Sequence, residues 1–137
     1  MAEPRPPVVL ELDWRGDLRF EGGSGPGRLL VDGDGKAGPS PVQTLAYALA
    51  GCMASDVALI LTKGRDDLHG LRARFTGRRA AEDPRRFVQI ELRFLVKGDI
   101  RAHKIERALA LSREKYCSVW HSLRQDIELT VTYEIET

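Results

Sequence analysis

Alternating apolar and polar residues, the pattern of a half-buried strand, recur in both halves of the chain. Glycine-rich or charged connections separate several of these stretches, so neighbouring ones are expected to pair as hairpins. A loose arm is expected over residues 1–7, because three of them are prolines. After the third strand, residues 32–38 are expected to form a flexible polar segment. The predicted strands are residues 8–14, 18–20, 28–31, 69–77, 87–96 and 127–135.

Between residues 41 and 61 the pattern changes to a run rich in alanine and leucine. Ser40 is a suitable N-cap and Pro41 suits the first helical position, which together predict a helix. A second helix is expected over residues 100–116, with Asp99 as its N-cap. Because these elements contain no repeated strand–helix–strand unit, the predicted fold class is α+β. The positions of the second helix that follow helical spacing are Ile105, Ala108, Leu109 and Ser112.

The first predicted helix is apolar on nearly every side, so most of its surface must be covered. In a chain of 137 residues, one small sheet can cover only one side, and a second copy of the chain is the simplest cover for the rest. We therefore expect a single domain that forms a homodimer. A membrane span is not expected, because the apolar run contains Ser55 and the charged Asp56 near its centre.

The charge balance excludes two broad classes of function. The chain has twenty-one Lys and Arg residues and twenty Asp and Glu residues, which give a net charge of +1. General nucleic-acid binders and polybasic membrane-surface proteins are strongly basic.

The chain carries no secretory signal pattern, so a cytoplasmic protein is expected. No metal site is expected, because no ligand spacing links the histidines at positions 69, 103 and 121.

Two cysteines are too few for a disulfide scaffold, and they leave two interpretations open. Cys52 and Cys117 are either ordinary buried residues or a dithiol pair that cycles with a disulfide. A reactive Cys52 would need a cation or several donors from elsewhere in the fold. The reason is that it lies in mid-helix, and Asp56 one turn later opposes a thiolate. The candidate cations are Arg28, Lys36 and the arginines of the long hairpin.

Cys117 lies where the second predicted helix ends, and the helix field there depends on the conformation of the next residues. The C-terminal end of that helix would oppose a thiolate, whereas a new helix beginning at Ser118 would favour one. The sequence leaves both geometries open. Tyr116 and Trp120, close to this cysteine, can wall an apolar pocket or pack in the core.

Residues 38–52 and 112–119 together carry a resemblance to a known family. In the first stretch Gly-Pro-Ser-Pro leads into a helix of small residues around Cys52, and the second stretch holds Cys117 after Arg-Glu-Lys-Tyr. With these features the chain resembles the OsmC/Ohr family, the osmotically inducible and organic hydroperoxide resistance proteins, over about residues 8–136. The resemblance implies an OsmC-like α+β fold, with β-sheets wrapped around the long central helices of an intertwined homodimer.

The same resemblance implies a thiol-dependent peroxidase that prefers organic or fatty-acid hydroperoxides. Cys52 would be the peroxidatic residue that becomes a sulfenic acid, and Cys117 the resolving residue that forms a disulfide with it. A lipoylated protein or another thiol would then reduce the disulfide, without a metal, flavin or other cofactor. Gln43 stands in the region where family members carry a Glu, and Arg28 is the candidate for their thiolate-stabilising Arg. The alternative is a non-catalytic OsmC-like dimer that binds an apolar ligand or senses redox state.

Overall fold

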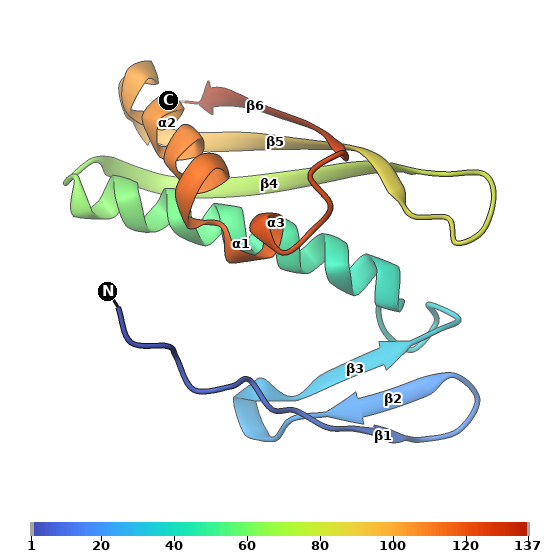
Figure 1. Ribbon diagram of the computed structural model, residues 1–137. Coiled ribbons are helices and arrows are strands. Elements are labelled where there is room, and N and C mark those ends of the chain that lie inside the picture. The colour runs from blue at the N-terminus through green and yellow to red at the C-terminus, as the bar shows by residue number, and fades with distance from the viewer. Residues whose placement is uncertain (1, 137) are drawn as a thin grey trace. The chain divides into compact units, whose positions relative to one another are not determined.

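Two three-stranded sheets and one long helix dominate the protein in the computed structural model, which describes residues 2–136 (Figure 1). This mixture of sheets and helices confirms the predicted α+β class. The chain divides into two compact units, Met1–Leu45 and Ala46–Thr137, and each unit holds one of the sheets. A single domain over the whole chain stays a prediction.

The N-terminal unit contains a small antiparallel sheet in the order β1-β2-β3. Its elements are β1 (Leu12–Trp14), β2 (Arg19–Gly22), the 3₁₀ helix η1 (Gly25–Gly27) and β3 (Leu29–Asp32). The predicted strand over residues 8–14 is wrong in its first half, because residues 8–11 are exposed and form no strand. Leu12 pairs with Gly22, the last residue of β2. Strand β2 therefore offers no paired residue opposite residues 8–11, and their backbone groups have no hydrogen-bond partners in this sheet. The loose arm expected over residues 1–7 therefore extends to residue 11, and residue 1 lies outside the described chain.

The segment after β3 is an ordered turn built around Asp32, which corrects the flexible segment predicted there. The carboxylate of Asp32 is almost fully buried and accepts hydrogen bonds from the backbone N–H groups of Ala37 and Asp34, both at 2.9 Å. These two bonds, the one from Ala37 first, lower the pKa of Asp32. An aspartate that follows a strand and precedes several glycines is typical of such a turn.

The C-terminal unit contains a mixed sheet in the order β4-β5-β6. Its strands are β4 (Asp67–Arg79), β5 (Phe87–Asp99) and β6 (Glu128–Glu136). The β4–β5 hairpin is antiparallel as predicted, whereas β6 lies parallel to β5. A parallel pair needs a crossover connection, and the helical stretch between the two strands supplies it. That stretch consists of α2 (Ala102–Leu111), the π-helical turn η2 (Ser112–Tyr116) and the short α3 (Ser118–His121).

Alternate residues of β5 form the centre of the hydrophobic core. Leu92 and Phe94 are fully buried, while Glu91 and Arg93, which alternate with them, are exposed to solvent. The predicted inward-facing positions of α2 and η2 are all buried, which confirms the helical spacing. The helix itself begins later than predicted: Asp99 pairs with Asp67 as the last residue of β5, and Arg101 is the N-cap. The pairing of β4 with β5 thus continues through Asp99, the residue that the sequence pattern assigns to the N-cap of the second helix.

Helix α1 (Pro41–Lys63) begins with a reciprocal cap. The Gln43 backbone N–H donates to Ser40 Oγ at 3.1 Å, and the Ser40 N–H donates to Gln43 Oε1 at 2.9 Å. By length and composition α1 could cross a membrane, but a helix in a protein core passes the same test. One stripe of α1 is fully buried in the core at Leu49, Met53, Val57 and Leu61. This stripe favours the interpretation as a core helix.

We expect Leu92→Ala to lower the free energy of unfolding by about 2–5 kcal/mol, because it removes a fully buried side chain from a packed core. Glu91→Ala, one residue earlier on the exposed face of β5, is the matched control and should change that free energy by no more than about 0.5 kcal/mol. Urea unfolding at a fixed protein concentration measures both. Equal losses in the two variants would contradict the alternation of the strand.

Candidate functional site

The two cysteines, far apart in the sequence, lie together with one carboxylate in the C-terminal unit. The Sγ atoms of Cys52 and Cys117 and a carboxylate oxygen of Asp56 all lie within 4.8 Å of one another. Cys52 and Asp56 are four residues apart on α1, so they lie on consecutive turns of the same helix face. Cys117 comes from the connection between η2 and α3, and both cysteines carry free thiols. We call these three side chains the thiol–carboxylate cluster.

A π-helical turn positions Cys117. The turn η2 continues α2 with one wide turn, a feature frequent at functional sites. The Cys117 backbone N–H closes it by donating to the Ser112 carbonyl oxygen at 2.8 Å. Cys117 is then the N-cap of α3, and its Sγ accepts a hydrogen bond from the Trp120 N–H at 3.4 Å. Of the two geometries that the sequence leaves open, the structure has a new helix beginning after Cys117.

The surroundings of Cys117 nevertheless disfavour its thiolate. Its side chain is fully buried, and this burial is the main cause that raises the pKa of Cys117 to about 11. The Trp120 N–H lowers this pKa, whereas the neighbouring Cys52 and Asp56 raise it. Cys117 is therefore a protonated thiol at neutral pH. Cys52 is only half-buried, so it is the thiol that a solute reaches more easily.

A buried serine holds the Asp56 carboxylate in place. Ser112 is fully buried in η2, and its Oγ donates a hydrogen bond to Asp56 Oδ2 at 2.8 Å. The sequence pattern places Ser112 on the inward side of its helix but does not pair it with Asp56. A signal exists in the sequence all the same, because a polar side chain on a buried helix face needs a hydrogen-bond partner.

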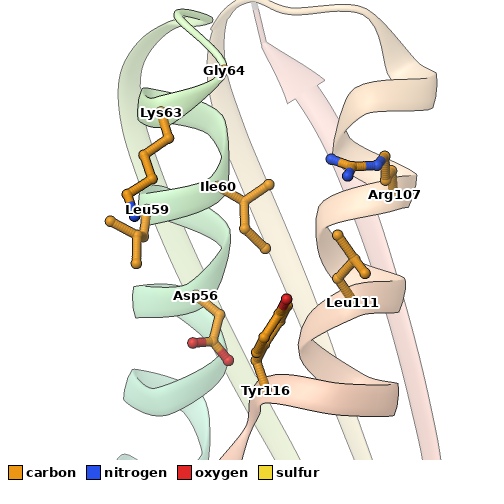
Figure 2. A pocket seen from close by; sticks show the side chains of 8 residues that line it. All are labelled: Asp56, Leu59, Ile60, Lys63, Gly64, Arg107, Leu111 and Tyr116. Atoms are coloured by element: carbon orange, nitrogen blue, oxygen red, sulfur yellow. The ribbon is translucent and has the colours of Figure 1, made fainter.

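A cavity of about 540 Å³ adjoins the cluster. Figure 2 shows side chains of α1 on one wall and side chains of α2 and η2 on the other. Asp56 lines the cavity and also belongs to the cluster, so the two adjoin at this carboxylate. Of the two aromatic candidates, Tyr116 lines the cavity, whereas Trp120 packs in the core. The full lining is Asp56, Leu59, Ile60, Lys63, Gly64, Arg107, Leu111 and Tyr116.

Two of the predicted site residues, Arg28 and Gln43, belong to the N-terminal unit. The Arg28 guanidinium forms an ion pair with Glu21 of β2. The Gln43 amide oxygen accepts the Ser40 N–H in the cap of α1, so this side chain has a structural partner. The roles predicted for Arg28 and Gln43 beside Cys52 stay predictions.

The histidines lie outside the thiol–carboxylate cluster. The His121 ring contacts the Arg113 carbonyl oxygen at 3.0 Å, and the His69 ring contacts the Asp67 carboxylate at 2.9 Å. The side chains that the structure brings together as ligand atoms are thus thiols and a carboxylate, a combination that histidine spacing cannot indicate.

Comparison with known proteins gives consistent results. The family model described as OsmC-like protein matches residues 33–132. Protein YhfA of Escherichia coli is 41% identical over 125 residues, which cover 89% of this chain and 93% of YhfA. The likeness therefore extends over nearly the whole of both proteins.

Solved structures share the fold at lower identity. A hypothetical protein from Aquifex aeolicus has a TM-score of 0.88 at 24% identity, with 96% of this chain and 98% of that chain covered. An organic hydroperoxide resistance protein OsmC from Legionella pneumophila has a TM-score of 0.70 at 14% identity, with 95% and 99% covered. At such identities the likeness establishes the fold.

The raised pKa of Cys117 predicts a loss of stability at high pH. The folded state holds the Cys117 proton more tightly than the unfolded state, whose thiol has a pKa of 9.0, so the contribution is complete below pH 9 and is lost as the pH rises toward about 11. We expect the stability advantage of the wild type over Cys117→Ala, measured by denaturant unfolding with a reductant present, to shrink across this range. A constant advantage from pH 8 to pH 11 would contradict the raised pKa.

Proposed function

The chain belongs to the OsmC-like protein family, and we propose that it is a thiol-dependent peroxidase that reduces organic hydroperoxides to alcohols. The observation that carries this proposal is the juxtaposition of Cys52 and Cys117, which the folded chain brings within 4.8 Å from two separate elements. The structural neighbours from Legionella pneumophila and Bacillus subtilis are both described as organic hydroperoxide resistance proteins, which points the same way.

In the first step the sulfur of Cys52 attacks the distal oxygen of the hydroperoxide. The O–O bond breaks, the sulfur is oxidised to a sulfenic acid, and the thiol proton ends on the departing alkoxide, which leaves as an alcohol. Cys52 takes this role because it is the half-buried thiol, and Asp56 beside it also lines the cavity. A hydroperoxide bound in the cavity would lie next to Asp56, and of the two nearby thiols Cys52 is the more exposed.

In the second step Cys117 resolves the sulfenic acid. Its sulfur attacks the Cys52 sulfur, an S–S bond forms, and the Cys117 proton leaves with the hydroxyl group as water. The raised pKa of Cys117 suits this order of events, because a protonated thiol does not compete with Cys52 for the peroxide. An external dithiol, such as a lipoyl group, then reduces the disulfide by exchange, and no resident cofactor takes part.

The cavity supports an apolar substrate. Its walls are largely aliphatic or aromatic side chains from Leu59, Ile60, Leu111 and Tyr116, and its volume of about 540 Å³ is within the usual range for small-molecule sites. The alkyl part of an organic or fatty-acid hydroperoxide would bury apolar area here, whereas hydrogen peroxide would gain nothing from it. The same cavity also supports the second candidate function, a non-catalytic dimer that binds an apolar ligand or senses redox state.

A stoichiometric oxidation separates these two functions. One equivalent of an organic hydroperoxide should consume both thiols of the reduced protein and lower its intact mass by two hydrogens, as counted with a thiol reagent and by mass spectrometry. Survival of both thiols at neutral pH would favour the ligand-binding alternative over the peroxidase.

Substitution of each cysteine should stop the cycle at a different point. Cys52→Ser should reduce hydroperoxide turnover to background, because it removes the attacking sulfur. Cys117→Ser should leave a Cys52 sulfenic acid that dimedone traps. Ser55→Ala is the matched control on the same helix: the Ser55 hydroxyl bonds to the Gly51 carbonyl oxygen of its own helix, so turnover should not change. Normal turnover of Cys52→Ser would remove Cys52 from the mechanism.

We also propose that the protein acts as a cytoplasmic homodimer. Beyond its buried stripe, α1 exposes the large side chains of Tyr47 and Leu59, with 72% and 52% of their surfaces accessible in one protomer. Light scattering at micromolar concentration should give the mass of two chains, because a second copy is the simplest cover for this helix. A monodisperse species of 15.3 kDa would contradict the dimer.

A further inference from the structure

The thiol–carboxylate cluster has the composition of a metal site as well as that of a redox site. Two sulfur atoms and one carboxylate oxygen, within 4.8 Å of one another, are three of the four ligands that Zn²⁺ takes in proteins. Tetrahedral coordination at the usual Zn–S and Zn–O bond lengths puts such ligand atoms about 3.5–3.8 Å apart. Rotation of the side chains would bring the three atoms to that spacing, since they already lie within 4.8 Å of one another.

Two hydrogen bonds prepare the ligands. Ser112 Oγ donates to one oxygen of Asp56, a contact that leaves the other carboxylate oxygen for a cation and fixes the direction in which it points. The Trp120 N–H donates to Cys117 Sγ and so supports negative charge on that sulfur. Outer partners of this kind orient the ligands of protein metal sites, and here they occur on two of the three side chains.

The charge of the cluster also favours a cation. Once the thiols ionise, three negative groups share one partly buried site. The positively charged side chains of the cavity lining are Lys63, two turns further along α1 than Asp56, and Arg107 on α2. A divalent ion between the three ligands would neutralise charge that the cluster itself does not compensate.

We propose that the reduced protein binds one divalent cation of the zinc type through Cys52, Asp56 and Cys117, and that formation of the disulfide releases it. Binding exchanges two thiol protons for the metal ion, and the cavity beside Asp56 gives the open fourth position to water. Oxidation by a hydroperoxide consumes two protons and yields the disulfide, an alcohol, water and the free ion. Of the two sulfur electron pairs that hold the metal, one becomes the S–S bond and the other passes to the peroxide as its O–O bond breaks, so the metal-bound and disulfide states exclude each other.

Metal titration of the reduced wild-type protein tests the binding step. Zn²⁺ added in competition with a chromophoric chelator should bind at one equivalent, and Co²⁺ should give the sulfur-to-metal charge-transfer band of a thiolate site. Cys52→Ser and Cys117→Ser should each weaken binding at least ~100-fold and abolish that band, because loss of a direct ligand exceeds the 10–100-fold loss typical of an outer partner. The absence of a charge-transfer band in the wild type would overturn the proposal.

The Asp56→Asn variant shows whether the metal site uses the Asp56 carboxylate as a ligand or consists of the two thiols alone. A site made of the two thiols alone does not use the Asp56 carboxylate, so in this variant it would bind Zn²⁺ at least as tightly as in the wild type. A site that uses Asp56 should bind at least ~10-fold more weakly. Asp99→Asn, an exposed carboxylate at the end of β5, is the control and should bind as the wild type does. Unchanged or tighter binding by Asp56→Asn would overturn the three-ligand site.

The release step rests on the proposed peroxidase, so it is measured with two oxidants. Diamide, which oxidises dithiols directly, should release the bound ion, and so should an organic hydroperoxide. Release by diamide alone would leave the metal site standing and contradict the peroxidase. Retention of the ion after complete disulfide formation would overturn the proposed link between oxidation and release.

Discussion

The rotation of α1 about its own axis is the constraint on which the rest of the site depends. Its buried stripe recurs every fourth residue and includes Met53 and Val57, which pack against the core of the C-terminal unit. Cys52 and Asp56 each precede one of these residues, so both are turned about 100° from the core direction, on the side where η2 and Cys117 lie. Packing of apolar side chains thus decides where the thiol and the carboxylate point, and no separate interaction is needed to align them.

The second half of the site depends on the way α2 ends. A regular α-helix through residue 116 would point its last side chains in other directions. In the wide turn η2, the Ser112 hydroxyl is buried against Asp56, and Cys117 becomes the N-cap of α3. Burial and charge then act against each other at Cys117. The new helix donates a hydrogen bond to the sulfur, but desolvation prevails and keeps the thiol protonated. The two cysteines differ mainly in solvent exposure, and the hydrogen bond from the start of α3 to Cys117 is the smaller effect.

Local patterns predict much of this fold, because strand and helix periods depend on neighbours in the sequence. The long hairpin, both helices and the inward positions of α2 follow from them, as does the resemblance that points to Cys52 and Cys117. The parallel pairing of β6, the shortening of the predicted strand at residues 8–14 and the hydrogen bond between Ser112 and Asp56 do not. Each of these depends on a partner distant in the chain, and one sequence alone does not show which residues the fold brings opposite one another.

The resemblance to the OsmC/Ohr family implies a Glu in the region of Gln43, and in this chain the Gln43 side chain takes part in the cap of α1. Its amide oxygen accepts the Ser40 N–H as a carboxylate would, but it carries no charge. What remains beside the thiols is the negative charge of Asp56, which acts against a thiolate at Cys117 and attracts cations. This negative charge would oppose the thiolate that a peroxidase needs, whereas it would help a metal site to hold its cation. A bound cation would favour ionisation of the sulfurs yet occupy the electron pairs that attack the peroxide, so the cluster can serve both only in turn.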